Sequence, residues 1–312
     1  MKKIIIILSI ALGALTFTSC EKENALTPNA NFIQNSDTTD MTVGGGSAGG
    51  GTSGLPAGFL ASTTPSNRAA LLEDFTGVRC GFCPDGHVKA ASAQQTLGPE
   101  NFIIMAVHAG SYAAPSTGWA NFTTPYGAAL VAQADVAGYP AGTINRLPAS
   151  SLGVSPQLNG SAMSRGSWET AGAAVNAMES PVNIGAKAII DASNNLEVKV
   201  DLYYTKDEVD ANNITVALLQ NGLVSNQSGG GQNYVQNHVL RDLITGQWGE
   251  VVTESTDSAD FVQKTFNYAV PADYNGTTTE GGGAVVINDL RVVVFVTRGQ
   301  TDVLTAIKVD VE

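Results

Sequence analysis

The stretch that decides the fold is LLEDFTGVRCGFC, at residues 71–83. The apolar run at 69–75 predicts a buried strand, and the alanine-rich run at 84–97 predicts a helix that opens on a proline. The loop between them carries Cys80 and Cys83. A redox dithiol is expected at such a place, because the unpaired amides and the dipole of a helix N-terminus stabilise a thiolate.

The two cysteines are expected to have different roles. Cys80 is predicted to be the more exposed nucleophile, with Arg79 adding positive potential beside it, and Cys83 is predicted to resolve a mixed disulfide. One alternative is a static disulfide that pins a turn, although so small a loop gains little from closure. Another is zinc completed by His87 and His108, but structural zinc needs four ligands and no second Cys-x-x-Cys exists. We expect no metal and no cofactor.

Strand and helix patterns continue on the C-terminal side of the motif and predict two folded domains. Strands are expected at 102–107 and 142–145 and helices at 128–134 and 168–178, a spacing that implies a parallel strand pair. Beyond Pro181 the apolar residues alternate with polar ones. These runs lie at 183–191, 196–202, 213–220, 261–270, 290–297 and 303–311, with 234–241 as a further candidate. We therefore predict an α/β domain at 65–180 followed by an all-β sandwich at 181–312.

The N-terminus predicts export and a lipid anchor. Two lysines precede an apolar run at 4–17, which is too short to span a bilayer but suits a signal peptide. Ser19-Cys20 then resembles a lipobox, so residues 1–19 are predicted to be removed and Cys20 to be lipidated. The alternative is an ordinary signal peptide with an incidental cysteine. Residues 20–64, which are rich in Gly and Ser, are predicted to be a disordered tether.

The cysteine count and the net charge narrow the classes of function. The chain has three cysteines, so lipidation of Cys20 leaves Cys80 and Cys83 to pair with each other. The formal net charge is −12, which gives no cationic excess to release counterions from a nucleic acid. We expect no nucleic-acid partner.

The cysteine motif resembles that of the thioredoxin superfamily. That resemblance implies that Asp74, six positions before the first cysteine, is buried beneath the dithiol and assists proton transfer. It also implies that Tyr139-Pro140 supplies a cis-proline loop that faces the disulfide and docks substrate, so Pro140 joins the candidate site. Arg79 stands where the superfamily usually has tryptophan, and the residues between the cysteines are Gly-Phe rather than Gly-Pro.

Several other polar residues are weaker candidates for the site. Strand alternation puts only one of Glu73 and Asp74 on the inward face. His108 ends a strand near the motif and is an auxiliary candidate for proton transfer, although a hydrogen-bonded structural histidine is the simpler interpretation. His87 is expected on the helix surface. His238 and Arg241 are expected to fix a turn or a domain contact.

The chain as a whole resembles the outer membrane protein twenty-eight family of Gram-negative lipoproteins. The resemblance rests on the lipobox, residues 75–84, His108, Tyr139-Pro140 with Ile144-Asn145-Arg146, residues 238–241 and residues 303–306. It implies a thioredoxin-like domain, an immunoglobulin-like sandwich and lipid attachment to the outer membrane, on its periplasmic or external face. Two functions follow as hypotheses: thiol–disulfide exchange on exported protein substrates, and non-catalytic binding or adhesion through the sandwich.

Overall fold

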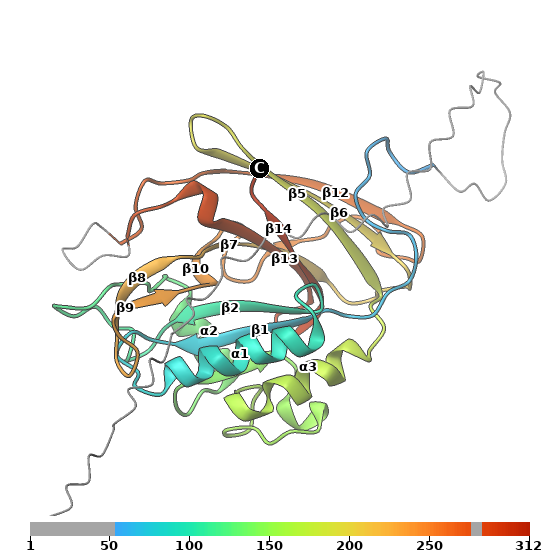
Figure 1. Cartoon of the computed structure of the whole chain (residues 1–312). Helices are drawn as coiled ribbons and strands as arrows, with labels where there is room; N and C mark the ends of the chain where they lie inside the picture. The colour runs from blue at the N-terminus through green and yellow to red at the C-terminus, as the bar shows by residue number, and fades with distance from the viewer. Residues whose placement is uncertain (1–53, 276–282) are drawn as a thin grey trace, which may run out of the picture. The chain divides into compact units, whose positions relative to one another are not determined.

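Sheets dominate the fold, and the α-helices of the described residues all precede Pro181 (Figure 1). The computed structural model describes residues 54–275 and 283–312. The α-helices are α1 (Cys83–Leu97), α2 (Gly127–Ala134) and α3 (Trp168–Asn176), and the 3-10 turns are η1 (Ala149–Leu152), η2 (Arg165–Ser167) and η3 (Ile287–Asp289). The strands are β1 (Ala70–Thr76), β2 (Phe102–His108), β3 (Ala141–Ile144), β4 (Met163–Ser164), β5 (Val182–Ile190), β6 (Asn195–Tyr204), β7 (Asn212–Gln220), β8 (Leu223–Gln227), β9 (Gly231–Gln236), β10 (Val239–Leu243), β11 (Glu250–Val251), β12 (Phe261–Ala269), β13 (Leu290–Arg298) and β14 (Asp302–Asp310).

The cysteine motif sits in a strand–helix–strand unit. β1 leads into α1, and β2 returns parallel to β1, which confirms the predicted parallel pair. Pro84 suits the first turn of α1 because its missing amide hydrogen would have no partner there. Gly98 ends the helix at a φ of +95°, a backbone conformation that residues with a Cβ rarely adopt. β3 runs antiparallel to β1, and β4 runs antiparallel to β3.

Strands in the second half of the chain contribute to two sheets that share a core. β12, β6 and β5 make a three-stranded sheet, and β7, β13 and β14 belong to a larger one. Apolar residues of both sheets, such as Val200 and Val294, are buried in one cluster. The alternating runs of β5, β6 and β12 form strands with one face inward, as predicted, whereas β7 and β13 are buried on both faces, so the prediction is wrong for them. The run at 234–241 forms parts of β9 and β10, whereas β8 was not anticipated.

One continuous sheet joins the two halves of the chain. Its order is β14-β13-β7-β10-β2-β1-β3-β4, with β11 paired to β7. The junction is a parallel bridge between Val239 of β10 and Ala106 of β2. The predicted division at residue 180 remains a prediction, and the described residues on its two sides pack as one unit.

Both faces of the central strands β1 and β2 are covered, so side chains on either face of β1 are buried. α1 and α3 pack on one face of β1 and β2, through residues such as Ala90 and Trp168. The other face packs against a cluster that includes Leu130 of α2 and Phe295 of β13. All the residues of β1 are consequently buried, on both sides of the strand.

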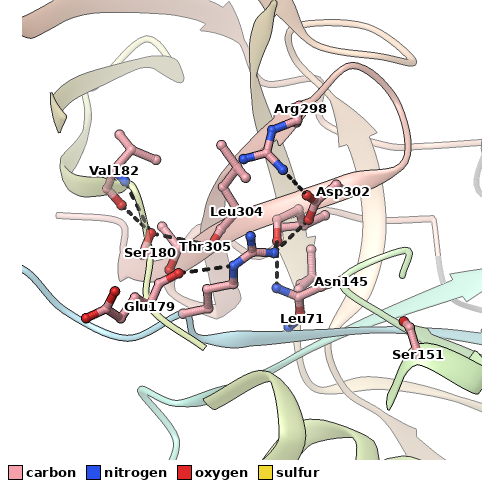
Figure 2. A network of polar contacts seen from close by, with 12 residues as sticks. Leu71, Asn145, Ser151, Glu179, Ser180, Val182, Arg298, Asp302, Leu304 and Thr305 are labelled. Atoms are coloured by element: carbon pink, nitrogen blue, oxygen red, sulfur yellow. Dashed lines mark hydrogen bonds and ion pairs between the residues drawn. The ribbon is translucent and has the colours of Figure 1, made fainter. Parts of the chain in front are cut away.

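A polar network ties β1 to β14 (Figure 2). Asn145 accepts a hydrogen bond from the Leu71 amide at 2.7 Å, and its Nδ2 donates to the Val303 carbonyl at 2.9 Å. Asp302 binds Arg68 on one side and Arg298 on the other, each at 2.7 Å. Since Asn145 is buried, its amide must find partners inside the protein, and it takes them from both strands.

Part of the predicted tether belongs to the folded unit. Of residues 20–64, the structure describes residues 54–64, and the Leu60 amide there donates to Asp201 of β6 at 2.6 Å. Phe59 also packs edge-on against Phe261 of β12, with ring centroids 5.5 Å apart. The predicted signal peptide at 1–19, Cys20 and the rest of the tether lie outside the described residues.

Candidate functional site

The cysteines form a disulfide at the N-terminus of α1. Cys80 lies in the turn that follows β1, Cys83 is the first residue of the helix, and their Cα atoms are 5.4 Å apart. Cys80 is the more exposed of the two, as predicted, but only by a small margin, because Cys80 is 2 % exposed and Cys83 is fully buried. The β8–β9 hairpin packs on the cysteine loop, where the Ser228 amide donates to the Val78 carbonyl at 2.8 Å.

Both neighbouring carboxylates of β1 are buried, one on each face of the sheet. The expectation that only one of Glu73 and Asp74 would lie inside is wrong, because that alternation applies only to a strand with one wet face. Glu73 receives two hydrogen bonds from Arg146, at 2.8 and 2.9 Å, and this buried pair neutralises both charges. Asp74 lies on the face covered by α1.

Asp74 lacks a compensating cation. Its Oδ1 has no hydrogen-bond partner, and its Oδ2 lies 3.8 Å from His87 Nε2. Burial raises the pKa of Asp74 to about 8, because a low-dielectric interior disfavours the charged form. A carboxyl group with such a pKa holds a proton near neutral pH and can release it.

His87 is not a helix-surface residue, contrary to the prediction. Its Nε2 lies 3.0 Å from Thr76 Oγ1 and its Nδ1 lies 2.7 Å from the Tyr234 hydroxyl. Burial lowers the pKa of His87 to about 4, so the imidazole is neutral at physiological pH. A cavity of about 110 Å³, lined by Asp74, His87, Tyr234 and His238 among others, separates α1 from the segment that joins β9 to β10.

His108 is buried and has no hydrogen-bond partner on either ring nitrogen. The interpretation as a hydrogen-bonded structural histidine is therefore wrong. Its ring packs edge-on against Phe122 at a centroid distance of 5.0 Å. Burial, with smaller contributions from His87 and Arg241, lowers the pKa of His108 to about 3, so it contributes a neutral imidazole.

Pro140 and Arg79 flank the disulfide loop and α1. The Tyr139–Pro140 peptide bond is cis, and Pro140 packs so closely on Gly86 of α1 that a Cβ at Gly86 would lie 3.0 Å from the proline ring. The Arg79 guanidinium donates to the Ser111 carbonyl. The structure thus places Asp74 and Pro140 against the helix that Cys83 opens, with Arg79 next to Cys80 in the loop.

Three residues that contact the cysteine loop or α1 were not identified from the sequence, namely Gln227, Ser228 and Tyr234. All three lie in the β8–β9 hairpin, about 150 residues beyond the cysteines in the sequence. Local sequence patterns do not predict contacts between residues so far apart. Within 54–275 and 283–312, no group of three or more His, Cys, Asp or Glu side chains is arranged to hold a metal ion. No helix in these ranges combines the length and apolarity needed to cross a membrane.

Comparisons with known proteins give a family and a fold. Residues 128–311, more than half of the chain, match the family model for outer membrane protein Omp28, and this segment begins after the cysteine pair. Among solved structures, HBP35 of Porphyromonas gingivalis is similar at a TM-score of 0.59 and 17 % identity, over 79 % of this chain and 76 % of that one. A domain of the outer membrane lipoprotein Omp28 from Porphyromonas gingivalis gives a TM-score of 0.31 at 21 % identity, over 43 % and 89 % of the two chains. The likeness to HBP35 shows a shared fold. No curated protein matches the chain.

Proposed function

The chain belongs to the Omp28 family of outer membrane proteins, which places it at the outer membrane as a lipoprotein, and we propose that its Cys80–Cys83 pair exchanges disulfides with exported proteins. The observation that carries the proposal is a Cys-x-x-Cys disulfide at a helix N-terminus, with a buried carboxyl group on the strand beneath that helix, whose pKa burial raises. Carboxyl groups with strongly perturbed pKa values are typical of functional sites. Cys20 is proposed as the lipidated residue that anchors the chain.

The exchange needs two attacks by thiolates. A substrate thiolate attacks Cys80 Sγ, the Cys80–Cys83 bond breaks, and Cys83 leaves as a thiolate stabilised by the N-terminus of α1. A second substrate thiolate then attacks the mixed disulfide and releases Cys80, so the substrate dithiol is oxidised and the cysteine pair is reduced by two electrons. The reverse sequence reduces a substrate disulfide. Asp74 is proposed to give a proton to the Cys83 thiolate or to take it back.

The topology supports the finer interpretation of the fold. The parallel β1–β2 pair, the intervening α1 and the antiparallel β3 and β4 follow the order expected of a thioredoxin-like domain. Pro140 in cis, packed on α1, fits the proposed substrate-docking loop. The two packed sheets built from β5 to β7 and β12 to β14 are proposed to be the immunoglobulin-like sandwich.

The proposal is tested by trapping. Cys83→Ser keeps the attacking sulfur but cannot resolve a mixed disulfide, so Cys80 should accumulate covalent adducts with exported proteins, detected on non-reducing gels and lost on reduction. Cys80→Ser with Cys83 intact is the matched control and should accumulate far fewer adducts. An adduct pattern that is empty in Cys83→Ser, together with no reduction of insulin by the wild-type protein, would refute exchange.

Burial of both sulfurs favours a second candidate function. A sealed disulfide suits a scaffold, and the chain would then serve as a lipid-anchored binding or adhesion protein that uses the sandwich. In that case Cys80→Ala combined with Cys83→Ala should leave the cellular phenotype of the protein intact. Loss of the phenotype in this double variant, with normal amounts of folded protein, would count against the binding function.

A further inference from the structure

We propose that the β8–β9 hairpin is a cap that controls access to the Cys80–Cys83 disulfide, and that Gln227 is the residue that holds the cap shut. The inference rests on the proposed exchange function, whose site it regulates. The hairpin forms a separate two-stranded sheet and pairs with no strand of the nine-stranded sheet. It can therefore move without breaking a ladder that holds the rest of the fold. Figure 1 shows it beside the N-terminal end of α1.

Gln227 links the hairpin directly to the cysteine loop. Its Nε2 donates to the Cys80 carbonyl at 3.0 Å and to the Gly77 carbonyl at 3.2 Å, and its Oε1 accepts from Gln236 Nε2 at 2.8 Å. Gln227 is 2 % exposed, and Gln236 is 1 % exposed. A buried amide whose donor and acceptor are both engaged fixes a geometry strongly, because breaking one bond leaves an unpaired polar group in the interior.

The hairpin backbone also touches the residues between the cysteines. Gly229 adopts a φ of +76°, and a Cβ there would lie 2.3 Å from the Gly81 carbonyl oxygen. Position 229 therefore requires glycine for two reasons, because its backbone is left-handed and because the Gly81 carbonyl lies too close for a side chain. The second strand is held by the hydrogen bond between Tyr234 and His87 of α1.

In the cysteine loop, the two cysteines are buried while the residue Phe82 between them is exposed. Phe82, between the two cysteines, is 70 % exposed, so the loop itself faces solvent while the sulfurs do not. Disulfide exchange requires a thiolate to approach in line with the S–S bond. The closed hairpin denies that approach, and reaction with any thiol must follow opening of the cap.

The test measures how fast the pair itself reacts. Dithiothreitol reduces the Cys80–Cys83 disulfide in the full-length protein, is itself oxidised to a cyclic disulfide, and the new thiols are counted by quenched alkylation and mass spectrometry. Gln227→Ala should accelerate reduction about tenfold, which corresponds to lowering the free energy of opening by about 1.4 kcal/mol. Gln232→Ala, at an exposed glutamine of the same hairpin, should stay within about twofold of the wild type.

A destabilised control separates opening of the cap from unfolding. Asn145→Ala weakens the β1–β14 junction without touching the hairpin, so it should not accelerate reduction. Equal rates for Gln227→Ala and the wild type, or equal acceleration by Asn145→Ala, would overturn the cap. Dithiothreitol replaces the natural substrate in this test, so the cap and the exchange function can fail separately. Acceleration by Gln227→Ala, with neither adducts in Cys83→Ser nor insulin reduction by the wild type, would retain the cap and refute exchange. Adducts without acceleration would retain exchange and overturn the cap.

Discussion

Replacing Asp74 by asparagine should change the pH dependence of stability in a defined direction. Burial raises the pKa of Asp74 in the folded protein to about 8, against an ordinary value of 3.8, so between these values the folded protein keeps a proton that the unfolded chain releases. Stability from this group is therefore fully present at low pH and is lost as pH rises toward 8. Asparagine is nearly isosteric with aspartic acid and carries no titratable proton, so Asp74→Asn should remove the decrease in stability that this group causes as pH rises.

The magnitude follows from linkage. One proton bound only by the folded state changes the free energy of unfolding by about 1.4 kcal/mol per pH unit. Between pH 5 and pH 7 the stability of Asp74→Asn should therefore rise relative to the wild type by about 3 kcal/mol. His87 and His108 contribute with the opposite sign, since their lowered pKa values give stability that is lost as pH falls, but both proteins contain them and the difference isolates Asp74.

The assay is urea unfolding of the oxidised protein at pH 5, 6 and 7, followed by circular dichroism. Asp85→Asn is the matched control, because Asp85 is an exposed carboxylate of α1. Its profile should parallel that of the wild type. Parallel profiles for Asp74→Asn and the wild type would mean that Asp74 is ionised in the folded protein, and would refute the reasoning from burial.

Three further predictions concern stability. Glu73→Ala should cost about 3–5 kcal/mol because it leaves Arg146 charged and unpaired in the interior, and Glu73→Leu combined with Arg146→Met should recover most of that loss in urea unfolding. Asn145→Ala should lower the free energy of unfolding by about 2–4 kcal/mol, because the Leu71 amide and the Ala69 and Val303 carbonyls lose their hydrogen bonds to Asn145. A thermal melt would measure this loss. Reducing the Cys80–Cys83 bond should cost only about 2 kcal/mol because the closed loop is short, which paired unfolding curves with and without reductant would measure.

Local structure was predictable from the sequence because it depends on local patterns. The apolar run at 102–107 and the alternation at 196–202 gave strands, and Pro84 and Gly98 bounded α1 as expected. The cysteine loop between β1 and α1 followed from the same patterns. These features rest on steric and hydrophobic rules that operate over a few residues.

The surroundings of the cysteines were not predictable, because they depend on contacts between distant residues. The bridge between Val239 and Ala106 joins strands from the two halves, and nothing in either segment specifies the other. β1 is covered on one face by α1 and α3, and on the other by the cluster that includes Leu130 of α2 and Phe295 of β13. Glu73 and Asp74 are both buried for that reason, and His87 loses its place on the surface to the hairpin.

The proposed proton-transfer role of Asp74 can be compared with the energetic contributions of Asp74 and of the disulfide. The Cys80–Cys83 bond contributes about 2 kcal/mol by closing its short loop. Holding Asp74 protonated at pH 7 costs about 4 kcal/mol relative to the unfolded chain, since its pKa is raised from 3.8 to about 8. A disulfide kept only to stabilise a turn has no need of a buried carboxyl group on the strand beneath its helix. Proton transfer to sulfur is the role proposed for this carboxyl group, and Asp74→Asn tests it directly: unchanged pH dependence in the reduction of the pair would refute that role.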